Sequence, residues 1–416
     1  MTTAVDASGW FGWWRAGTPE GRRALVAGGL GWMLDSFDVM LYALVLAALI
    51  KDLGISKDTA GLLGSVTLVA SAIGGLAFGL VADRYGRTRA LIASILIYSV
   101  FTAMCGFSQT VMQLAVFRIC LGLGMGGEWA SGAALVSETW PAAYRGKALG
   151  FMQSAWAIGY GAAALVVAIV MPIWGWRAVF FVGVLPALLT VWVQQRVEEP
   201  AMWRERRVRA SASRASLGDI FRGDLLRLTV PVTLMNACTM FAWWGFNQWI
   251  PAYLSLPVAD GGIGLSTRVM SGFIIAMQVG MWFGYVSFGF ISDAIGRKRA
   301  YVIYVLMAAV LLMGYALTRT PAVLLVLGPV TAFFATGYFT GFGAVTAEIY
   351  PTEIRATAQG FTYNIGRLAS AVAPYAVGSL AAGRGFGAAF SVAAVAFVLA
   401  AVAWIWIPET KGRALA

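Results

Sequence analysis

Two carboxylates stand inside one of the most apolar stretches of the chain. Asp35 and Asp38 lie in the run from Leu30 to Leu49, which is long enough to cross a bilayer because a span needs about 20 residues. They are three residues apart, so they share one face of a helix. A charge at the centre of a membrane helix costs on the order of 3 kcal/mol, so this face must avoid lipid. The pair indicates a buried site for a proton, a cation or an arginine; a structural ion pair that only fixes helix packing is the alternative.

The composition indicates a helical protein that crosses a membrane many times. The chain has 416 residues, of which 60% are hydrophobic and 12% are charged, and its mean hydropathy is +0.76. Its net charge of +11 does not indicate nucleic-acid binding, because the basic residues gather in alternate loops. The chain has no histidine, and its three cysteines stand singly in apolar runs, which argues against a metal site, a cofactor or a disulfide framework. No nucleotide-binding loop suggests an enzyme.

Apolar runs predict an all-α membrane protein with twelve spans. They fall near 24–50, 60–82, 89–107, 110–136, 146–170 and 176–195, and then near 226–255, 268–292, 298–317, 322–347, 356–380 and 384–407. The bias of Lys and Arg predicts that both termini are cytoplasmic. The expected parts are a cytoplasmic segment 1–23, a six-helix bundle 24–195, an Arg-rich linker 196–225, a second bundle 226–407 and a cytoplasmic tail 408–416. The linker is expected to tether the halves; lipid binding or regulation is the alternative.

An internal repeat relates the two bundles. The segment from Gly79 to Leu91 aligns with that from Gly289 to Tyr301 at an offset of 210 residues, and a second block from Ser137 aligns with one from Ala347 in the same register. Two blocks in one register are hard to obtain by chance. Six spans repeated in parallel predict two bundles related by an axis along the membrane normal, with a binding site between them near mid-depth.

These motifs resemble the major facilitator superfamily over nearly the whole chain. The loop Gly79-x-x-x-Asp83-Arg84-x-Gly86-Arg87-x-Arg89 is similar to its cytoplasmic signature, and Arg118-x-x-x-Gly122 resembles a proton-coupling motif. The segments Leu34–Leu46, Gly126–Trp129 and Glu198–Pro200 look most like the sialate and lactate:proton symporters, with the aromatic acid:proton symporters next. The resemblance implies secondary transport by alternating access. Its implied cytoplasmic gate consists of Asp83, Arg87, Arg89, Glu138, Arg145, Asp293, Arg297, Arg299, Glu348 and Arg355.

Helix geometry places a basic residue at the level of the two aspartates. At about 1.5 Å of rise per residue, Asp35 and Asp38 lie roughly 16 and 21 Å from the cytoplasmic face, and Arg118 lies roughly 18 Å from it. We therefore expect Arg118 to face the aspartates, with Asp35 and then Asp38 as proton carrier. Glu128 is a secondary coupling candidate on the same predicted helix as Arg118.

Arg367 reaches the same depth from the second half and has no acidic neighbour in sequence. A planar guanidinium can hold a carboxylate through two parallel hydrogen bonds, which predicts an anionic substrate. Pairing with helix-end carbonyls, or with Asp38 across the cavity, is the alternative. The other candidates for substrate binding are polar or aromatic residues at this level: Gln153, Trp156, Asn247, Gln248, Gln278, Tyr363 and Asn364.

The expected function is proton-coupled import of a small organic anion, such as a monocarboxylate, across the cell inner membrane by a functional monomer. An aromatic acid:proton symporter is one alternative. An uncoupled facilitator or exchanger of a small polar solute is another, and in it the buried charges would be structural.

Overall fold

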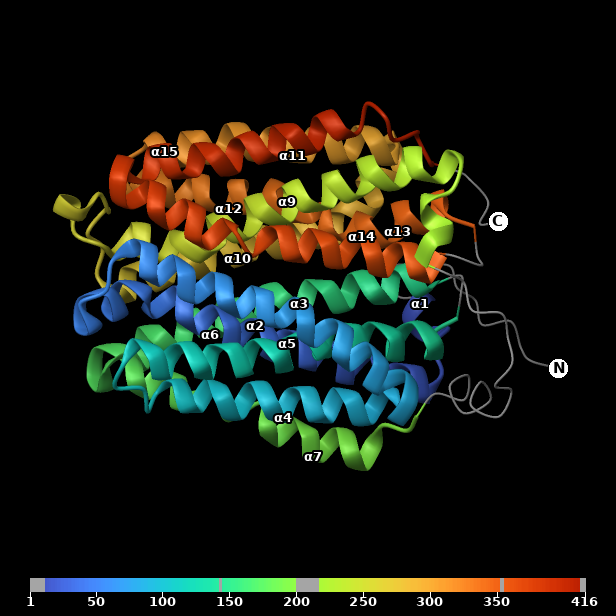
Figure 1. Ribbon diagram of the computed structural model, residues 1–416, viewed down its shortest axis with the longest axis horizontal. Coiled ribbons are helices and arrows are strands. Elements are labelled where there is room, and N and C mark those ends of the chain that lie inside the picture. Colours follow the sequence, from blue (N-terminus) through green and yellow to red (C-terminus); the bar gives the residue numbers. More distant parts are fainter. Residues whose placement is uncertain (1–11, 142–143, 200–216, 352–354, 412–416) are drawn as a thin grey trace.

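A computed structural model describes residues 12–141, 144–199, 217–351 and 355–411, and these contain helices and turns without a β-strand (Figure 1). In the first half the helices are α1 (Gly12–Arg15), α2 (Pro19–Leu53), α3 (Lys57–Tyr85), α4 (Arg87–Cys105), α5 (Val111–Thr139), α6 (Arg145–Val182) and α7 (Ala187–Arg196). In the second half they are η2 (Leu217–Phe221), α9 (Asp224–Ser255), η3 (Val258–Asp260), α10 (Thr267–Ile295), α11 (Arg297–Leu317), α12 (Pro321–Gly337), α13 (Phe339–Ile349), α14 (Arg355–Ser370) and α15 (Ala373–Ala403). Most of the expected linker, 200–216, lies outside the described residues, as do 1–11 and 412–416.

Two of the long helical segments cross the membrane twice. The described residues contain 10 segments long and apolar enough to span a bilayer, and two of these have 51 and 46 residues. At about 1.5 Å of rise per residue, a straight helix of either length would be more than twice as long as the roughly 30 Å thickness of a hydrocarbon core. Each is interrupted by a glycine outside the helical region, Gly175 with φ 75° and Gly385 with φ 79°. These interruptions give the twelve spans that the sequence predicts.

The two halves lie side by side with their helices roughly parallel, α2 to α7 in the lower part of Figure 1 and α9 to α15 in the upper part. One end of the bundle carries the turns at Gly86 and Gly296, and we call it the motif end. The opposite end carries the α2–α3 turn and η3, and we call it the η3 end.

The repeat extends to a helix cap that the sequence reading did not anticipate. At the motif end, the Glu199 carboxylate accepts hydrogen bonds from the backbone N–H groups of Arg87 (2.7 Å) and Thr88 (3.1 Å), at the start of α4. The Glu409 carboxylate does the same for Arg297 (2.8 Å) and Lys298 (3.2 Å), at the start of α11. A carboxylate satisfies free N–H groups at a helix N-terminus and complements the helix dipole there.

The halves meet closely at the η3 end. The Lys57 ammonium donates to the carbonyl oxygen of Asp260 (2.7 Å), and the backbone N–H of Tyr375 donates to the Ser65 hydroxyl (3.2 Å). Between these bonds the backbones approach so closely that a Cβ atom on Gly61 would lie 2.5 Å from the Pro374 carbonyl oxygen. We call this contact of α3 with α15 the seam.

The Glu409 cap predicts a pH-dependent contribution to stability. Burial alone would raise the pKa of Glu409, but four backbone N–H groups donate to its carboxylate, and the pKa is lowered overall. The contribution is therefore present above the ordinary glutamate pKa of about 4.3 and is lost as the pH falls through the lower pKa of the folded protein. At pH 7, Glu409→Gln should lose about 1 kcal/mol, a typical value for a cap, and should lower the thermal unfolding midpoint of the purified protein.

The same measurement across pH provides the control. The gap between wild type and Glu409→Gln should narrow as the pH falls below about 4.3 and close below the lower pKa of the folded protein, where the wild-type carboxyl is protonated too. Asp260→Asn, at an exposed carboxyl in η3, should leave the midpoint unchanged at pH 7. A gap that stays constant down to pH 3 would contradict the role of the ionised Glu409.

The close contact at the seam predicts that adding one methyl group to α3 will push the two halves apart at the η3 end. Gly61→Ala places a Cβ atom against the Pro374 carbonyl oxygen and so disfavours this closed contact. Spin labels on the exposed residues Lys51 and Val258 should report longer distances by double electron–electron resonance. Gly79→Ala is the matched control on the same helix, since a Cβ atom there would have no neighbour within 4 Å. Identical distance distributions for the two variants would rule out the seam as the closing contact.

Candidate functional site

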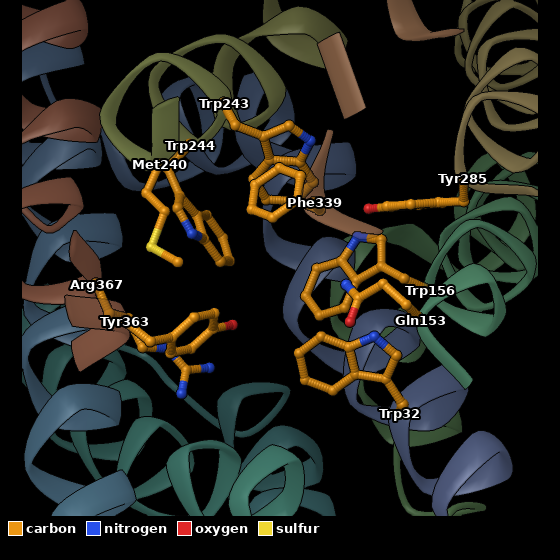
Figure 2. A pocket seen from close by; sticks show the side chains of 10 residues that line it. All are labelled: Trp32, Gln153, Trp156, Met240, Trp243, Trp244, Tyr285, Phe339, Tyr363 and Arg367. Carbon is orange, nitrogen blue, oxygen red and sulfur yellow. The ribbon is translucent and has the colours of Figure 1, made fainter. Parts of the chain in front are cut away.

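A small cavity lies between the two halves, near the middle of the helices (Figure 2). The first half contributes residues of α2 and α6, and the second half contributes residues of α9, α10, α13 and α14. Seven of the ten lining side chains are aromatic. The lining residues are Trp32, Gln153, Trp156, Met240, Trp243, Trp244, Tyr285, Phe339, Tyr363 and Arg367.

Trp156 is the centre of the aromatic wall. Its ring centroid lies 4.7 Å from that of Trp32 in its own half, and 5.6 and 6.2 Å from those of Trp243 and Trp244 in the other half. The Ser36 hydroxyl donates to the Trp156 carbonyl oxygen (2.8 Å) and so holds α2 against α6. The wall therefore crosses the boundary between the halves and offers flat apolar faces, which suit a planar ligand.

Arg367 is the one cation that lines the cavity within the described residues. It is 4% exposed, and its guanidinium forms neither a hydrogen bond nor an ion pair within 4.0 Å in the described part of the chain. Figure 2 shows Arg367 and Tyr363 on one side of the cavity, with Gln153, Trp156 and Trp32 on the other. A buried guanidinium with free donors is costly unless a ligand or a nearby charge compensates it.

Four of the eight predicted substrate-binding residues line the cavity, namely Gln153, Trp156, Tyr363 and Arg367. Asn247 instead donates to the Trp243 carbonyl oxygen (3.2 Å), and Asn364 donates to that of Gly360 (2.8 Å). Gln248 and Gln278 are buried elsewhere, beside Gly64 and Gly161 respectively. These four residues do not line the cavity as described, because depth was estimated without the direction in which each side chain points, and a role for them in substrate binding stays a prediction.

Six of the lining residues were not predicted from the sequence. They are Trp32, Met240, Trp243, Trp244, Tyr285 and Phe339. A signal existed for Trp32, which lies three residues before Asp35 and therefore on the same face of the same predicted helix. For Tyr285 and Phe339 nothing in the sequence distinguishes a cavity wall from a packed core.

In the described part of the chain, Arg118 does not form the expected ion pair with Asp35 or Asp38. Arg118 is buried, its Nε donates to the Leu63 carbonyl oxygen (3.2 Å), and its guanidinium carbon lies 3.6 Å from the ring centroid of Tyr42. Tyr42 is one helical turn beyond Asp38 on α2. The expected level was therefore wrong by about one turn, or 5.4 Å, which is within the error of choosing where each span enters the membrane.

Asp38 has its own surroundings, away from Arg118. It is 1% exposed, and the Thr102 hydroxyl donates to its Oδ2 (3.1 Å), whereas Oδ1 has no hydrogen-bond partner. Oδ1 lies beside Gly183, where a Cβ atom would approach it to 3.0 Å. Gly183 lies in the break between α6 and α7, so Asp38 adjoins an interrupted span.

Asp35 and Glu128 form a second acidic group on the side of Arg367. Glu128 is fully buried, and neither of its oxygens has a hydrogen-bond partner among the described residues; the same is true of Oδ2 of Asp35. A Cβ atom on Gly31, one turn before Asp35, would lie 2.5 Å from Oε1 of Glu128, so the two carboxyls lie near the same face of α2. Arg367 acts on both electrostatically from the other half. The expected alternative, a bridge from Arg367 to Asp38, is not formed.

The predicted gate residues pair within each half at the motif end. Arg87 bonds to Glu138 (3.0 Å), and Arg297 bonds to Glu348 (3.3 Å) and also to Asp293. Arg89 and Arg299 are exposed. The side chains of Asp83, Arg145 and Arg355 lie outside the described residues. That these gate residues pair across the two halves in another conformation stays a prediction.

Comparisons with known proteins agree with this architecture. The model of the Major Facilitator Superfamily matches residues 29–287 and 256–416. A cis,cis-muconate transport protein of Acinetobacter baylyi is 31% identical over 93% of this chain and 94% of its own length. The sialic acid transporter NanX of Escherichia coli is 32% identical over 92% of this chain and 93% of its own.

Among solved structures, the xylose transporter XylE from E. coli, in a partially occluded inward open conformation, superposes with a TM-score of 0.77. It shares 21% identity, and the match covers 96% of this chain and all of that one. The twelve spans, the repeated motifs and these matches establish that the chain belongs to the Major Facilitator Superfamily, a family of membrane transporters.

Proposed function

We propose that the protein imports a small organic acid together with protons, by alternating access to the cavity between its halves. The observation that carries the proposal is Arg367, a buried cation that has no hydrogen-bond partner in the described part of the chain and lies in a cavity with mostly aromatic walls. We place the motif end and both termini in the cytoplasm, since the starts of α4 and α11 are rich in Arg and Lys. All lining residues come from one chain, so the proposal needs no second copy.

The walls favour a planar acid over a flexible aliphatic one. Trp156 and Trp32 from one half face Trp243 and Trp244 from the other, and flat apolar faces gain most from a conjugated ligand. The muconate-transporting relative supports a conjugated acid, and the sialic acid relative supports a carboxylate in general.

Proton coupling is supported by the buried carboxyls of the first half. Asp35, Asp38 and Glu128 each have an oxygen without a hydrogen-bond partner. Ionised carboxylates are costly in such surroundings, and proton binding removes the cost. In an uncoupled facilitator these three groups would have only a structural role.

Uptake into proteoliposomes tests the proposal. Across lactate, N-acetylneuraminate, benzoate and nicotinate, an inward proton gradient should stimulate uptake, and the planar acids should be taken up best. Arg367→Gln removes two charge-assisted hydrogen bonds to the carboxylate, which should weaken substrate binding about 10- to 100-fold. Arg367→Lys should keep the charge and recover only part of that loss, since a bidentate contact is not available to an ammonium.

Arg384→Gln is the control, because it removes an exposed arginine from the same half. It should leave substrate affinity unchanged. Wild-type affinity in a folded Arg367→Gln protein would show that the carboxylate binds elsewhere. Equal uptake with and without the proton gradient would favour the uncoupled facilitator.

A further inference from the structure

We infer that the cavity selects planar monocarboxylates that carry a second, neutral hydrogen-bond acceptor at the end away from the carboxylate. The indole N–H groups of Trp32 and Trp156 bind this acceptor, while Arg367 holds the carboxylate. This inference rests on the proposed function and adds to it a second polar subsite and the class of substrate that this subsite selects.

Two tryptophans in the cavity wall have an N–H group without an acceptor. Trp32 and Trp156 are each 3% exposed, and Nε1 of neither has a hydrogen-bond partner in the described part of the chain. A buried donor without an acceptor costs free energy, so buried indole N–H groups usually have a partner. Both residues line the cavity, and their ring centroids are 4.7 Å apart. The two donors therefore form one site to which a ligand can bring an acceptor.

Trp243 has a third unpartnered N–H group. It belongs to α9 in the second half, as Arg367 belongs to α14, and it lies on another side of the cavity from Trp32 in Figure 2. The pair in the first half is therefore the donor site that faces Arg367 across the cavity.

The chemistry of indole decides what this site binds. An indole N–H donates a hydrogen bond and cannot accept one. The Gln153 amide and the Tyr285 hydroxyl, which Figure 2 shows on the same side of the cavity, can do either. The two tryptophans therefore require an acceptor on the ligand, and the two adaptable groups are compatible with one.

A neutral acceptor suits this side of the cavity better than a second carboxylate. Arg367 is the one lining cation within the described residues, and it lies on the opposite side (Figure 2). A Cβ atom on Gly31, the neighbour of Trp32, would lie 2.5 Å from Oε1 of Glu128, and Asp35 follows one turn later on the same helix. A second anion here would have no cation beside it, and α2 brings two acidic side chains to the same region. A carbonyl oxygen or a ring nitrogen avoids that cost.

The two polar ends of the cavity come from different halves of the protein. Arg367 belongs to α14, whereas Trp32 and Trp156 belong to α2 and α6. A ligand with both groups therefore connects the halves. A ligand with a carboxylate alone leaves the indole donors unsatisfied and binds more weakly.

Matched pairs of acids test the subsite on the full-length protein in detergent micelles. Isothermal titration calorimetry compares benzoate with isonicotinate, in which a ring nitrogen replaces the C–H group opposite the carboxylate. Isonicotinate should bind about tenfold more tightly, because it supplies an acceptor to donors that benzoate leaves unpaired. 4-Carbamoylbenzoate should bind about tenfold more tightly than terephthalate, which has the same shape but a second negative charge.

Phenylalanine variants keep an aromatic ring and remove the N–H group. In Trp32→Phe/Trp156→Phe the preference for isonicotinate over benzoate should fall from about tenfold to about one, and each single variant should keep part of it. The readout is a ratio of two affinities in one protein, so a general loss of packing cancels. Trp140→Phe is the matched control, because Trp140 is buried with an unpartnered Nε1 but is not among the lining residues. It should keep the wild-type preference.

The outcomes separate this inference from the proposed function. Equal wild-type affinity for benzoate and isonicotinate, with both acids lost in Arg367→Gln, would overturn the acceptor subsite and leave the carboxylate site intact. A preference that survives in a folded double variant would overturn the role of the indoles. Terephthalate binding as tightly as 4-carbamoylbenzoate would overturn the requirement for a neutral acceptor.

If the double variant does not fold, the single variants and the two pairs of acids on the wild-type protein still decide the inference. Failure of the folded wild-type protein to bind any of the four acids would overturn both this inference and the proposed binding of planar acids.

Discussion

The balance of charge at mid-depth is the constraint on which the rest of the structure depends. Two guanidiniums and three carboxyls are buried there, and none of them forms an ion pair within 4.0 Å of another in the described residues. They are not held in fixed salt bridges, so their mutual compensation is electrostatic and adjustable. A site of this kind responds to any added charge, whether a proton or a carboxylate, by changing which groups are ionised.

The charges are placed where the internal repeat is broken. Most structural devices occur twice at the offset of 210 residues, including the Glu199 and Glu409 caps and the interruptions at Gly175 and Gly385. The buried charges occur once. Their counterparts in the other half are uncharged: Gly245 for Asp35, Gln248 for Asp38, Gly328 for Arg118, Tyr338 for Glu128 and Ala157 for Arg367. The residues that occur in both halves stabilise the shared helical framework. The buried charges that occur in only one half make the two halves chemically different.

The sequence predicts depth along a helix well and direction around it poorly. The twelve spans follow from apolar runs, and Arg367, Tyr363, Gln153 and Trp156 were placed at the cavity because each lies near the middle of its span. Asn247 and Gln248 have similar depth but point elsewhere, which depends on how α9 packs. The partner of Arg118 was missed by one turn, because the residue at which a span enters the membrane is uncertain by about that much. The Glu409 cap joins residues 112 positions apart and has no local signal.

The strengths of the contacts differ in a way that suits two rigid halves. Within each half, the caps and the Arg87–Glu138 and Arg297–Glu348 pairs are hydrogen bonds to charged groups, which are about twice as strong as neutral ones. Across the seam, the described hydrogen bonds are those of Lys57 and Tyr375, both to neutral acceptors, and the remaining contact is glycine against backbone. A net value of about 1 to 3 kcal/mol for each such bond keeps the closed and open arrangements within a few kcal/mol of each other. The halves can then separate at the η3 end without loss of their internal structure, and a ligand that binds one arrangement more tightly than the other by a few kcal/mol would change which arrangement is favoured.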